Sequence, residues 1–491
     1  MYVCLVTDQL ATEEQAGARP GLRTRWQRLV TASVNRLTAD RRATVDTVVE
    51  APAPVRPIDL TDDATVTEVL DLAERAGEVV LASGTAVMDT TAQIEFIAAT
   101  YGLSKCDIDV TYNSIRISAD RGPKLPPAST MRVVHYRALD FTRLAAVDRL
   151  TRRIRRELVP PQEALAALDR ITSAPHPYPR WVATFGWALM AAGVALLLNG
   201  GWLIALLSFA TTTLIDRTNR LLNRRGLPFF FQHMAGGVIA ATPAVLISTY
   251  AQNLHLDPAL IIAAGIAVLL AGLQLVGAVE DAITGAPITA SGRMLEVIMM
   301  TGGIIAGIAL TLRVAEVFEA SVPSVDVSST RDLTTLPLKL LAGALTAGAF
   351  ALACYAERRA LAAAAFSGAA ATVVYLLVQH FGFGPIVSSG GAATVVGLAG
   401  GLLARRALIP PLVVAVAGIT PLLPGLRVYR GLYALLNDEL LIGFNQLFSA
   451  FAVGLALAAG VTLGEWIARD LRRPRIVERI GPSRRARRAS S

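Results

Sequence analysis

Residues 178–197, YPRWVATFGWALMAAGVALL, mark the point at which the chain changes character. Before Trp181 the sequence is rich in arginine and partly polar. From residue 182 almost to the C-terminus, apolar stretches long enough to cross a bilayer follow one another. A hydrocarbon layer tolerates only helices or closed barrels as spanning structures. The change at Trp181 therefore predicts a polytopic α-helical membrane protein that is preceded by a soluble segment.

Composition supports this class. Of 491 residues 53% are hydrophobic and 17% are charged, and the mean hydropathy of +0.49 is a poor match to a soluble domain. The net charge of +8 comes mainly from arginines in the N-terminal region, between the spans and in the tail. This placement fits anionic membrane lipids as partners, and we expect no nucleic-acid partner. Cys4, Cys106 and Cys354 have neither metal nor redox spacing, so no metal site or disulfide framework is predicted.

The apolar stretches predict about ten spans of a length that crosses the hydrocarbon core. Arginines between spans two and three, six and seven, and eight and nine indicate cytoplasmic loops, which places both termini in the cytoplasm of a multi-pass protein of the cell (plasma) membrane. Arg427 and Arg430 fall in a loop that this topology places outside, either as a local violation or as a functional pair that faces the pathway. The predicted spans are 182–198, 201–216, 229–250, 258–279, 294–314, 336–355, 360–380, 386–404, 407–423 and 440–467.

A short internal sequence repeat indicates that the membrane part consists of two halves. LLAGL at 269–273 is expected to close span four, and LLPGL at 422–426 is expected to close span nine. Two halves of five spans require a repeat that is inverted across the membrane, a common plan for alternating-access carriers; coincidence in leucine-rich sequence is the alternative. Prolines in span nine favour an interrupted helix, and the glycines of span eight favour close helix packing over an unwound backbone.

The domain organisation follows from these patterns. Residues 1–60 are expected to be disordered, residues 61–177 to form a small cytoplasmic α+β domain, and residues 469–491 to form a basic cytoplasmic tail. Between them lie the two transmembrane halves, 178–335 and 336–468. The α+β domain is predicted to contain helices at 64–81, 85–101, 141–157 and 161–173, a hairpin at 108–117 and a third strand at 131–136.

Several short motifs, taken in their order along residues 64–468, resemble the threonine/serine exporter family. They are Ala82-Ser83-Gly84-Thr85, the segment His135 to Leu144, Tyr178-Pro179-Arg180-Trp181, Glu280-Asp281 through Arg293 to Glu296, and Pro421-Leu422-Leu423-Pro424-Gly425. The resemblance implies about ten transmembrane helices after an N-terminal cytoplasmic domain. It also implies proton-driven export of L-threonine and L-serine from the cytoplasm. One departure is Ala271, where the family usually carries a proline before the glycine of the first-half motif.

The candidate site residues are chosen for this chemistry. A zwitterion needs a cation or a helix N-terminus for its carboxylate, and proton coupling needs a carboxylate whose pKa depends on the open side. Asp281, Glu296 and Glu280 are predicted to couple protons, although such charges can also merely mark helix ends. The predicted substrate-binding residues are Gly272, Gln274, Arg293, Pro424, Gly425, Arg427 and Asn445.

Enzyme motifs are missing from the chain: there is no H-E-x-x-H, no P-loop and no G-x-S-x-G. We therefore expect no enzyme activity and no cofactor. Two alternatives to threonine and serine export stay open: export of another small polar solute, and a membrane-anchored hydrolase or signalling module that acts through residues 64–175. The oligomeric state is also open, a homo-oligomer included.

Overall fold

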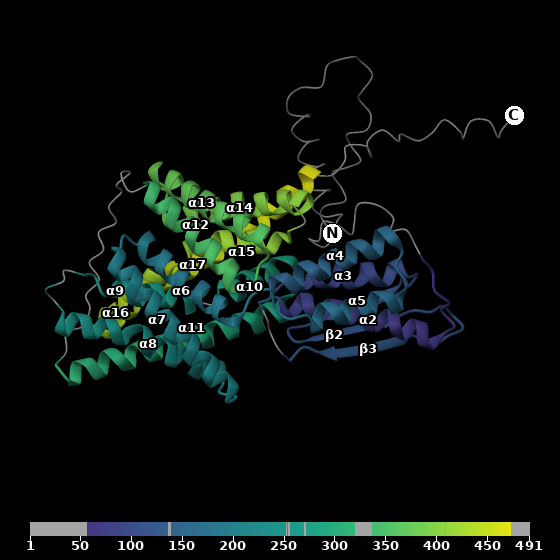
Figure 1. The fold of residues 1–491 in the computed structure, drawn as a ribbon, viewed down its shortest axis with the longest axis horizontal. Helices are drawn as coiled ribbons and strands as arrows, with labels where there is room; N and C mark the ends of the chain where they lie inside the picture. Colours follow the sequence, from purple (N-terminus) through teal and green to yellow (C-terminus); the bar gives the residue numbers. More distant parts are fainter. Residues whose placement is uncertain are drawn as a thin grey trace, which may run out of the picture. The chain divides into compact units, whose positions relative to one another are not determined.

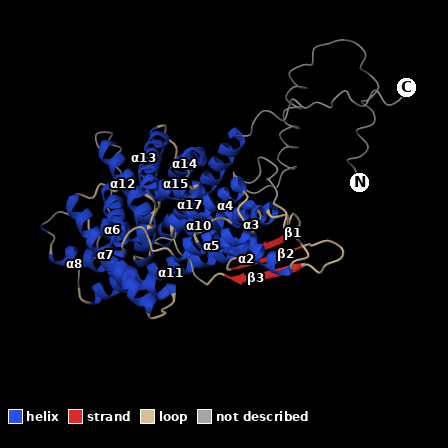
Figure 2. Cartoon of the chain, turned by 45° about the vertical axis from the view of Figure 1, so that its right-hand side comes forward, coloured by secondary structure: helices blue, strands red, loops and turns tan. Residues whose placement is uncertain are grey.

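The computed structural model describes residues 56–135, 139–251, 253, 256–269, 272–319, 336–407 and 409–472. Of the segment predicted to be disordered, residues 1–60, residues 1–55 lie outside the described residues, as does the basic tail beyond Arg472. Residues 56–60 are described, and there the N–H groups of Arg56 and Ile58 donate to the carbonyls of Thr100 and Tyr101. Within the described ranges the chain is mostly helical (Figure 1). Figure 2 shows that the strands are confined to the part of the chain before α4.

The N-terminal part, residues 56–173, contains the elements predicted from its periodicity. They are α2 (Asp63–Ala82), α3 (Val87–Thr100), β1 (Cys106–Val110), β2 (Ser114–Ala119), β3 (Ala128–Val133), α4 (Phe141–Glu157) and α5 (Pro161–Ser173). Asp62 caps α2, because its carboxylate accepts a hydrogen bond from the Ala64 N–H.

The three strands form one antiparallel sheet in the order β1-β2-β3. The predicted hairpin is present, with Ile108 opposite Ile117 and Asp109 opposite Arg116. The fully buried Ile115 and Ile117 join the core that Val66 and Leu72 of α2 also enter. Alternation along β2 therefore points the apolar side chains toward the helices.

Twelve α-helices and the short 3-10 helix η3 follow the N-terminal part within the described residues. Those of the first half are α6 (Arg180–Leu197), α7 (Trp202–Arg224), α8 (Phe229–Tyr250), α9 (Ala259–Leu269), α10 (Gly272–Thr284) and α11 (Pro287–Val317). Those of the second half are α12 (Leu336–Ala353), α13 (Arg358–His380), α14 (Pro385–Ala407), α15 (Pro411–Ile419) with the short η3 (Thr420–Leu422), α16 (Gly425–Leu436) and α17 (Leu440–Arg472).

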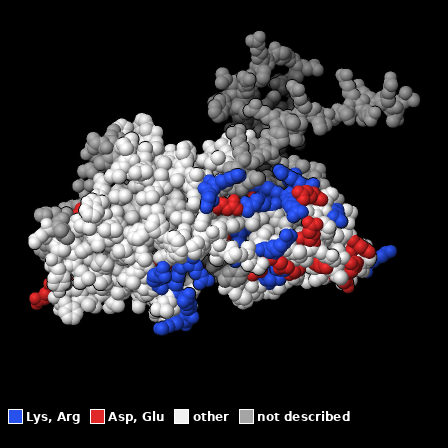
Figure 3. Space-filling model, viewed as in Figure 1, with Lys and Arg blue, Asp and Glu red and all other residues white. Residues whose placement is uncertain are grey.

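Seven of these described helices are long and apolar enough to cross a membrane, and up to nine spans result if each of two bent pairs counts as one. The chain therefore has the helices of a multi-pass membrane protein. Predicted span two corresponds to α7, which is not among the nine, because its C-terminal half is rich in polar side chains. Charged side chains gather on the N-terminal part, whereas the helical part shows a broad face almost without charge (Figure 3).

The LLxGL motifs do not close their spans, contrary to the sequence prediction. After the first motif the chain continues as α10, which meets α9 at 48°, and after the second it continues as α16, which meets the α15–η3 segment at 43°. Arg427 and Arg430 consequently lie on helix α16 and not in a loop. The predicted interruption of span nine is confirmed, since the proline-containing segment Pro421–Pro424 separates its two helical pieces.

Within each half, glycines bring the backbones of two helices into contact, and the two helices hold the same places in both halves. A Cβ on Gly307 of α11 would collide with the Met234 carbonyl of α8, and a Cβ on Gly464 of α17 would collide with the Thr394 carbonyl of α14. Gly397 of α14 likewise lies against the Val461 carbonyl of α17, which confirms the packing interpretation of the span-eight glycines. In both halves, the third and the fifth helical segments are thus joined by small residues.

The N-terminal part is joined to the helical part by specific contacts. The Phe141 N–H donates to the Cys354 carbonyl at 3.0 Å, and Arg149 pairs with Glu357 at 2.7 Å. The first two turns of α4 therefore lie along the turn between α12 and α13. A second set of contacts involves α10 and α11 and belongs to the site described next.

Candidate functional site

In each of the two bent helix pairs, the second helix begins with a glycine. Gly272 is the first residue of α10, and Gly425 is the first residue of α16, with Pro424 as its N-cap. A helix that starts within an apolar stretch presents free N–H groups and the positive end of its dipole. At Gly425 this start touches α9, because an added Cβ would lie 2.7 Å from the Ala263 carbonyl oxygen.

A polar cavity of about 220 Å³ lies beside the N-terminal half of α16. We call it the α16–α17 cavity. Arg427 and Arg430 line it from α16, and Asn445, Gln446 and Ser449 line it from α17. The two arginines are three residues apart, as are Gln446 and Ser449, so each set lies on one helix face. Arg427 also donates a hydrogen bond to the Ser449 hydroxyl.

The residue types of this cavity match the groups of a small zwitterion. Two guanidinium groups offer charge-assisted hydrogen bonds to a carboxylate. The amide oxygens of Asn445 and Gln446 and the Ser449 hydroxyl can accept hydrogen bonds from an ammonium or pair with a hydroxyl. The volume is below the roughly 300 Å³ at which sites for drug-sized ligands begin, so it suits a small solute.

A second polar cluster, here the α10–α11 cluster, lies at the end of the first bent pair. Arg293 of α11 pairs with Asp281 of α10 at 3.1 Å, and the two side chains are 4% and 0% exposed. Glu280 is buried as well. Gly277 makes room for this pair, since a Cβ there would collide with the Arg293 guanidinium. The cluster is thus built into the protein interior.

The N-terminal part covers the α10–α11 cluster. The Val87 N–H at the start of α3 donates to Asp281 at 2.8 Å, and Arg293 donates to the Thr85 carbonyl at 2.9 Å. The Tyr112 hydroxyl donates to Glu296 at 3.0 Å. Because α3 has no side-chain cap from its own segment, the Asp281 carboxylate serves as the anion at its N-terminus. The pair therefore holds the turn before α3 against α10 and α11.

The structure brings the predicted residues together in two places and not in one. Asp281, Arg293 and Glu296 are gathered at the α10–α11 cluster, while Arg427 and Asn445 line the α16–α17 cavity. Gln274 is partly buried on α10 and lines none of the cavities described here.

Sequence reasoning missed Ser449 and the groups that cover the α10–α11 cluster, namely Thr85, Val87 and Tyr112. Ser449 lies one turn after Asn445, so the spacing alone indicates that the two residues share a face of the helix. The contacts of Thr85 and Val87 are made by main-chain atoms, and no sequence pattern predicts such contacts.

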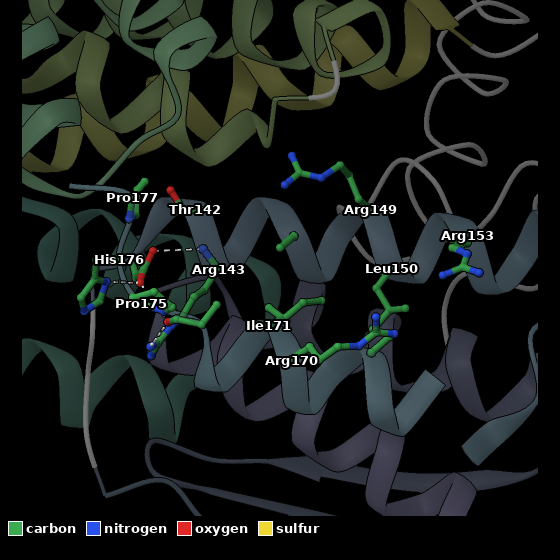
Figure 4. A pocket seen from close by; sticks show the side chains of 14 residues that line it. Thr142, Arg143, Arg149, Leu150, Arg153, Arg170, Ile171, Pro175, His176 and Pro177 are labelled. Carbon is green, nitrogen blue, oxygen red and sulfur yellow. Dashed lines mark hydrogen bonds and ion pairs between the residues drawn. The ribbon is translucent and has the colours of Figure 1, made fainter. Parts of the chain in front are cut away.

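Another cavity, of about 440 Å³, lies between α4 and α5. Arg149 and Arg153 line it from α4 and Arg170 from α5 (Figure 4). Asp140 pairs with His176 at 2.8 Å at one end. Because Arg149 and Arg153 already pair with Glu357 and Glu163, and Leu150 and Ile171 form an apolar floor, this groove is a weaker candidate for a zwitterion than the α16–α17 cavity.

Comparison with known proteins gives consistent results over most of the chain. Residues 71–315 match the family model described as "Putative threonine/serine exporter", and residues 339–467 match the one described as "Threonine/Serine exporter, ThrE". A "Threonine/serine exporter" from Corynebacterium glutamicum is 44% identical over 439 residues, which cover 88% of this chain and 90% of the relative.

A "Probable threonine/serine exporter" from Mycobacterium tuberculosis is 41% identical over 419 residues, which cover 84% of this chain and 78% of the relative. No solved structure matches. The family consists of transporters and not of enzymes, so the hydrolase alternative is set aside. On this evidence the chain belongs to the threonine/serine exporter family.

Proposed function

We propose that this protein exports L-threonine and L-serine from the cytoplasm across the plasma membrane, driven by the proton motive force. The observation that carries the proposal is the α16–α17 cavity, where Arg427 and Arg430 lie opposite three neutral polar side chains. This is a site for a carboxylate-bearing solute with further hydrogen-bonding groups. The names of the relatives supply the substrate class.

Alternating access between two inverted halves is the mechanism that the helix order supports best. Each half has a bent pair in fourth place that is followed by a long helix, α11 or α17. Bent helices at corresponding positions of two halves are typical of carriers that bind solute where helices are interrupted. In this mechanism Gly272 and Gly425 start the half-helices, and Gln274 and Pro424 lie beside these two glycines along the chain.

Proton coupling is assigned to Asp281, Glu296 and Glu280 at the α10–α11 cluster. Arg293 pairs with Asp281 at 3.1 Å, and opening of this pair is proposed to accompany transfer of the proton. The covering N-terminal part is proposed to lie in the cytoplasm, with both termini on that side and the basic residues against anionic lipids. Movement of this part would then accompany exchange of the proton.

The direct test follows free amino acid as it leaves cells loaded with a threonine- or serine-containing dipeptide. Cells with this protein are expected to export both amino acids faster than cells without it, and a protonophore is expected to abolish the difference. Equal efflux in the two strains would refute the substrate assignment. Efflux that resists the protonophore would refute the energy source. Competition by loaded alanine, aspartate or succinate measures the alternative of another small polar solute.

The coupling assignment has its own test in Asp281→Asn. The amide keeps an oxygen for the Val87 N–H but cannot carry the proton, so the variant is expected to reach the membrane and lose proton-coupled export. The measurement is efflux at several external pH values beside an immunoblot of the membrane fraction. A normal pH dependence in this variant would contradict the role of Asp281.

A further inference from the structure

Helix α7 carries a continuous polar face that no sequence motif marked. Ser208, Thr212, Asp216, Asn219 and Asn223 recur every three or four residues, so they lie on one side of the helix. Ser208 and Thr212 are each 1% exposed. On the other side of the same helix, Leu206 and Leu214 are each 56% exposed, as expected for side chains that face lipid.

The hydrogen bonding of this face is incomplete. The side-chain oxygens of Ser208, Thr212 and Asn219 are buried and have no hydrogen-bond partner among the residues that the structure describes. Other hydroxyls in these helices are satisfied locally: Thr213 and Thr249 donate to the carbonyl four residues earlier. Buried polar groups in proteins are almost always hydrogen-bonded, by water where the protein supplies no partner. Water molecules are therefore needed as hydrogen-bond partners for these three side chains of α7.

The polar face of α7 runs from the middle of the helical part toward the arginine-rich end of the helix. From Ser208 to Asn223 the helix rises about 22 Å, more than half of the roughly 30 Å hydrocarbon core. Midway along the face Asp216 pairs with Arg220 at 2.9 Å, and Arg220 reaches the Arg180 carbonyl at the start of α6. Asn223 accepts from Gln232 at 3.4 Å. The face thus connects the arginine-rich end of α7 with the middle of the helical part.

Helix packing through small polar residues explains Ser208 and Thr212 but not the rest of the face. Packing needs no carboxylate or carboxamide at the following turns, and a carboxylate inside a helical bundle is costly unless it has a function. The corresponding helix α13 shows the contrast. There Ser367 donates to the Val414 carbonyl and Thr372 donates to the Gly368 carbonyl, so its hydroxyls have protein partners.

We propose that the polar face of α7 lines a water path from the cytoplasm to the middle of the membrane domain, with Asp216 midway along it. The proposal rests on the proposed proton-driven export and names the route for its proton. Waters between the hydroxyls of Ser208 and Thr212 carry the proton toward Asp216. Its carboxylate accepts the proton from the path and releases it to cytoplasmic water, so that no charge is left behind.

The test measures water access directly and does not depend on transport. Ser208→Cys and Thr212→Cys are made in a full-length protein whose Cys4, Cys106 and Cys354 are replaced by serine or alanine. Leu206→Cys and Leu214→Cys are the matched controls on the lipid-facing side at the same depths. Inside-out vesicles are treated with a charged, membrane-impermeant methanethiosulfonate reagent, and the rate of labelling is followed by mass shift.

The cysteines at 208 and 212 are expected to react at least about tenfold faster than those at 206 and 214, because a charged reagent is excluded from hydrocarbon. Equal rates on the two sides of α7 would overturn the path. Labelling only from the outer side, in right-side-out vesicles, would overturn its direction. Because Ser208→Cys and Thr212→Cys are tested separately, misfolding of one variant leaves the other to decide.

Asp216 is tested by the pH profile of export in Asp216→Asn, with Asp216→Glu as the conservative variant. A flattened profile in the first and a retained profile in the second are expected, and an unchanged profile in Asp216→Asn would remove Asp216 from the path. The outcomes separate the two proposals. Fast labelling without threonine or serine export would refute the proposed substrates and keep the path. Export of both amino acids without labelling would support the proposed substrates and refute the path.

Discussion

The two polar clusters of the helical part lie on corresponding helices, one at the C-terminal end of α10 and the other in the N-terminal half of α16, and they differ in what fills them. At the α10–α11 cluster, Asp281 and Arg293 are buried and bonded to main-chain groups of the N-terminal part. At the α16–α17 cavity, Arg427 and Arg430 border a space of about 220 Å³. In the first half the charged side chains bind the N-terminal part, and in the second half they border an open space.

This difference leads us to expect separate tasks for two helices that start alike but carry their charges at opposite ends. Both α10 and α16 begin with glycine after a bend, so the backbone offers the same positive helix terminus twice. The side chains that follow decide the outcome: α10 supplies a carboxylate pair, and α16 supplies two arginines. We therefore expect substitutions at the α10–α11 cluster to affect stability and coupling, and those at the α16–α17 cavity to affect solute binding.

The largest expected effect is on export by Arg427→Ala. The variant loses the guanidinium that faces the cavity and bonds Ser449, so threonine efflux should fall to the level of cells without the protein while its amount in the membrane stays normal. Arg359→Ala is the matched control, because Arg359 is exposed on the first turn of α13. Full efflux in Arg427→Ala would place the solute elsewhere.

Asp281→Ala should have the largest effect on stability. It leaves Arg293 buried without its carboxylate, and breaking a buried pair in this way costs about 3–5 kcal/mol. Glu316→Ala is the control, because its pair with Arg313 is solvent-exposed and worth at most about 1 kcal/mol. Thermal unfolding in detergent compares the two. If both variants unfold at similar temperatures, the α10–α11 cluster does not hold the N-terminal part.

A smaller loss of stability is expected for Gly425→Ala. The new methyl group meets the Ala263 carbonyl and the Ala267 backbone nitrogen of α9, and overpacking of this kind costs about 1–3 kcal/mol. Gly302→Ala on α11 is the control, since a Cβ there meets nothing within 4 Å. The same unfolding measurement serves both. A neutral Gly425→Ala would show that α9 and α16 move apart freely.

The smallest effect is expected for Tyr112→Phe, which keeps the ring and removes the hydroxyl that donates to Glu296. A loss of about 1 kcal/mol would loosen the contact between the hairpin and α11. Limited proteolysis after the N-terminal part should become faster, whereas Tyr250→Phe, at an 83% exposed position, should change nothing. Identical proteolysis rates would show that this bond does not help to hold the N-terminal part on α11.

Much of the local structure was predictable because it depends on near neighbours. The hairpin around Tyr112 and the ends of α4 and α5 agree with the predictions, since alternation and helical periodicity are local properties. The LLxGL motifs were located correctly but interpreted wrongly as span ends. Leucine and glycine patterns do not reveal whether a helix resumes after a bend.

The sequence by itself determined that this is a multi-pass membrane protein of the threonine/serine exporter family, because hydropathy and motif order are written along the chain. It also named most of the charged and polar residues that gather at the two clusters. Only the tertiary structure decided which of them meet. Asp281 caps α3 from 194 positions away, and the orphaned hydroxyls of α7 are recognisable only once the surrounding helices have excluded other partners. The physical reason is that burial and hydrogen-bond satisfaction belong to the packed chain, and no local pattern encodes them.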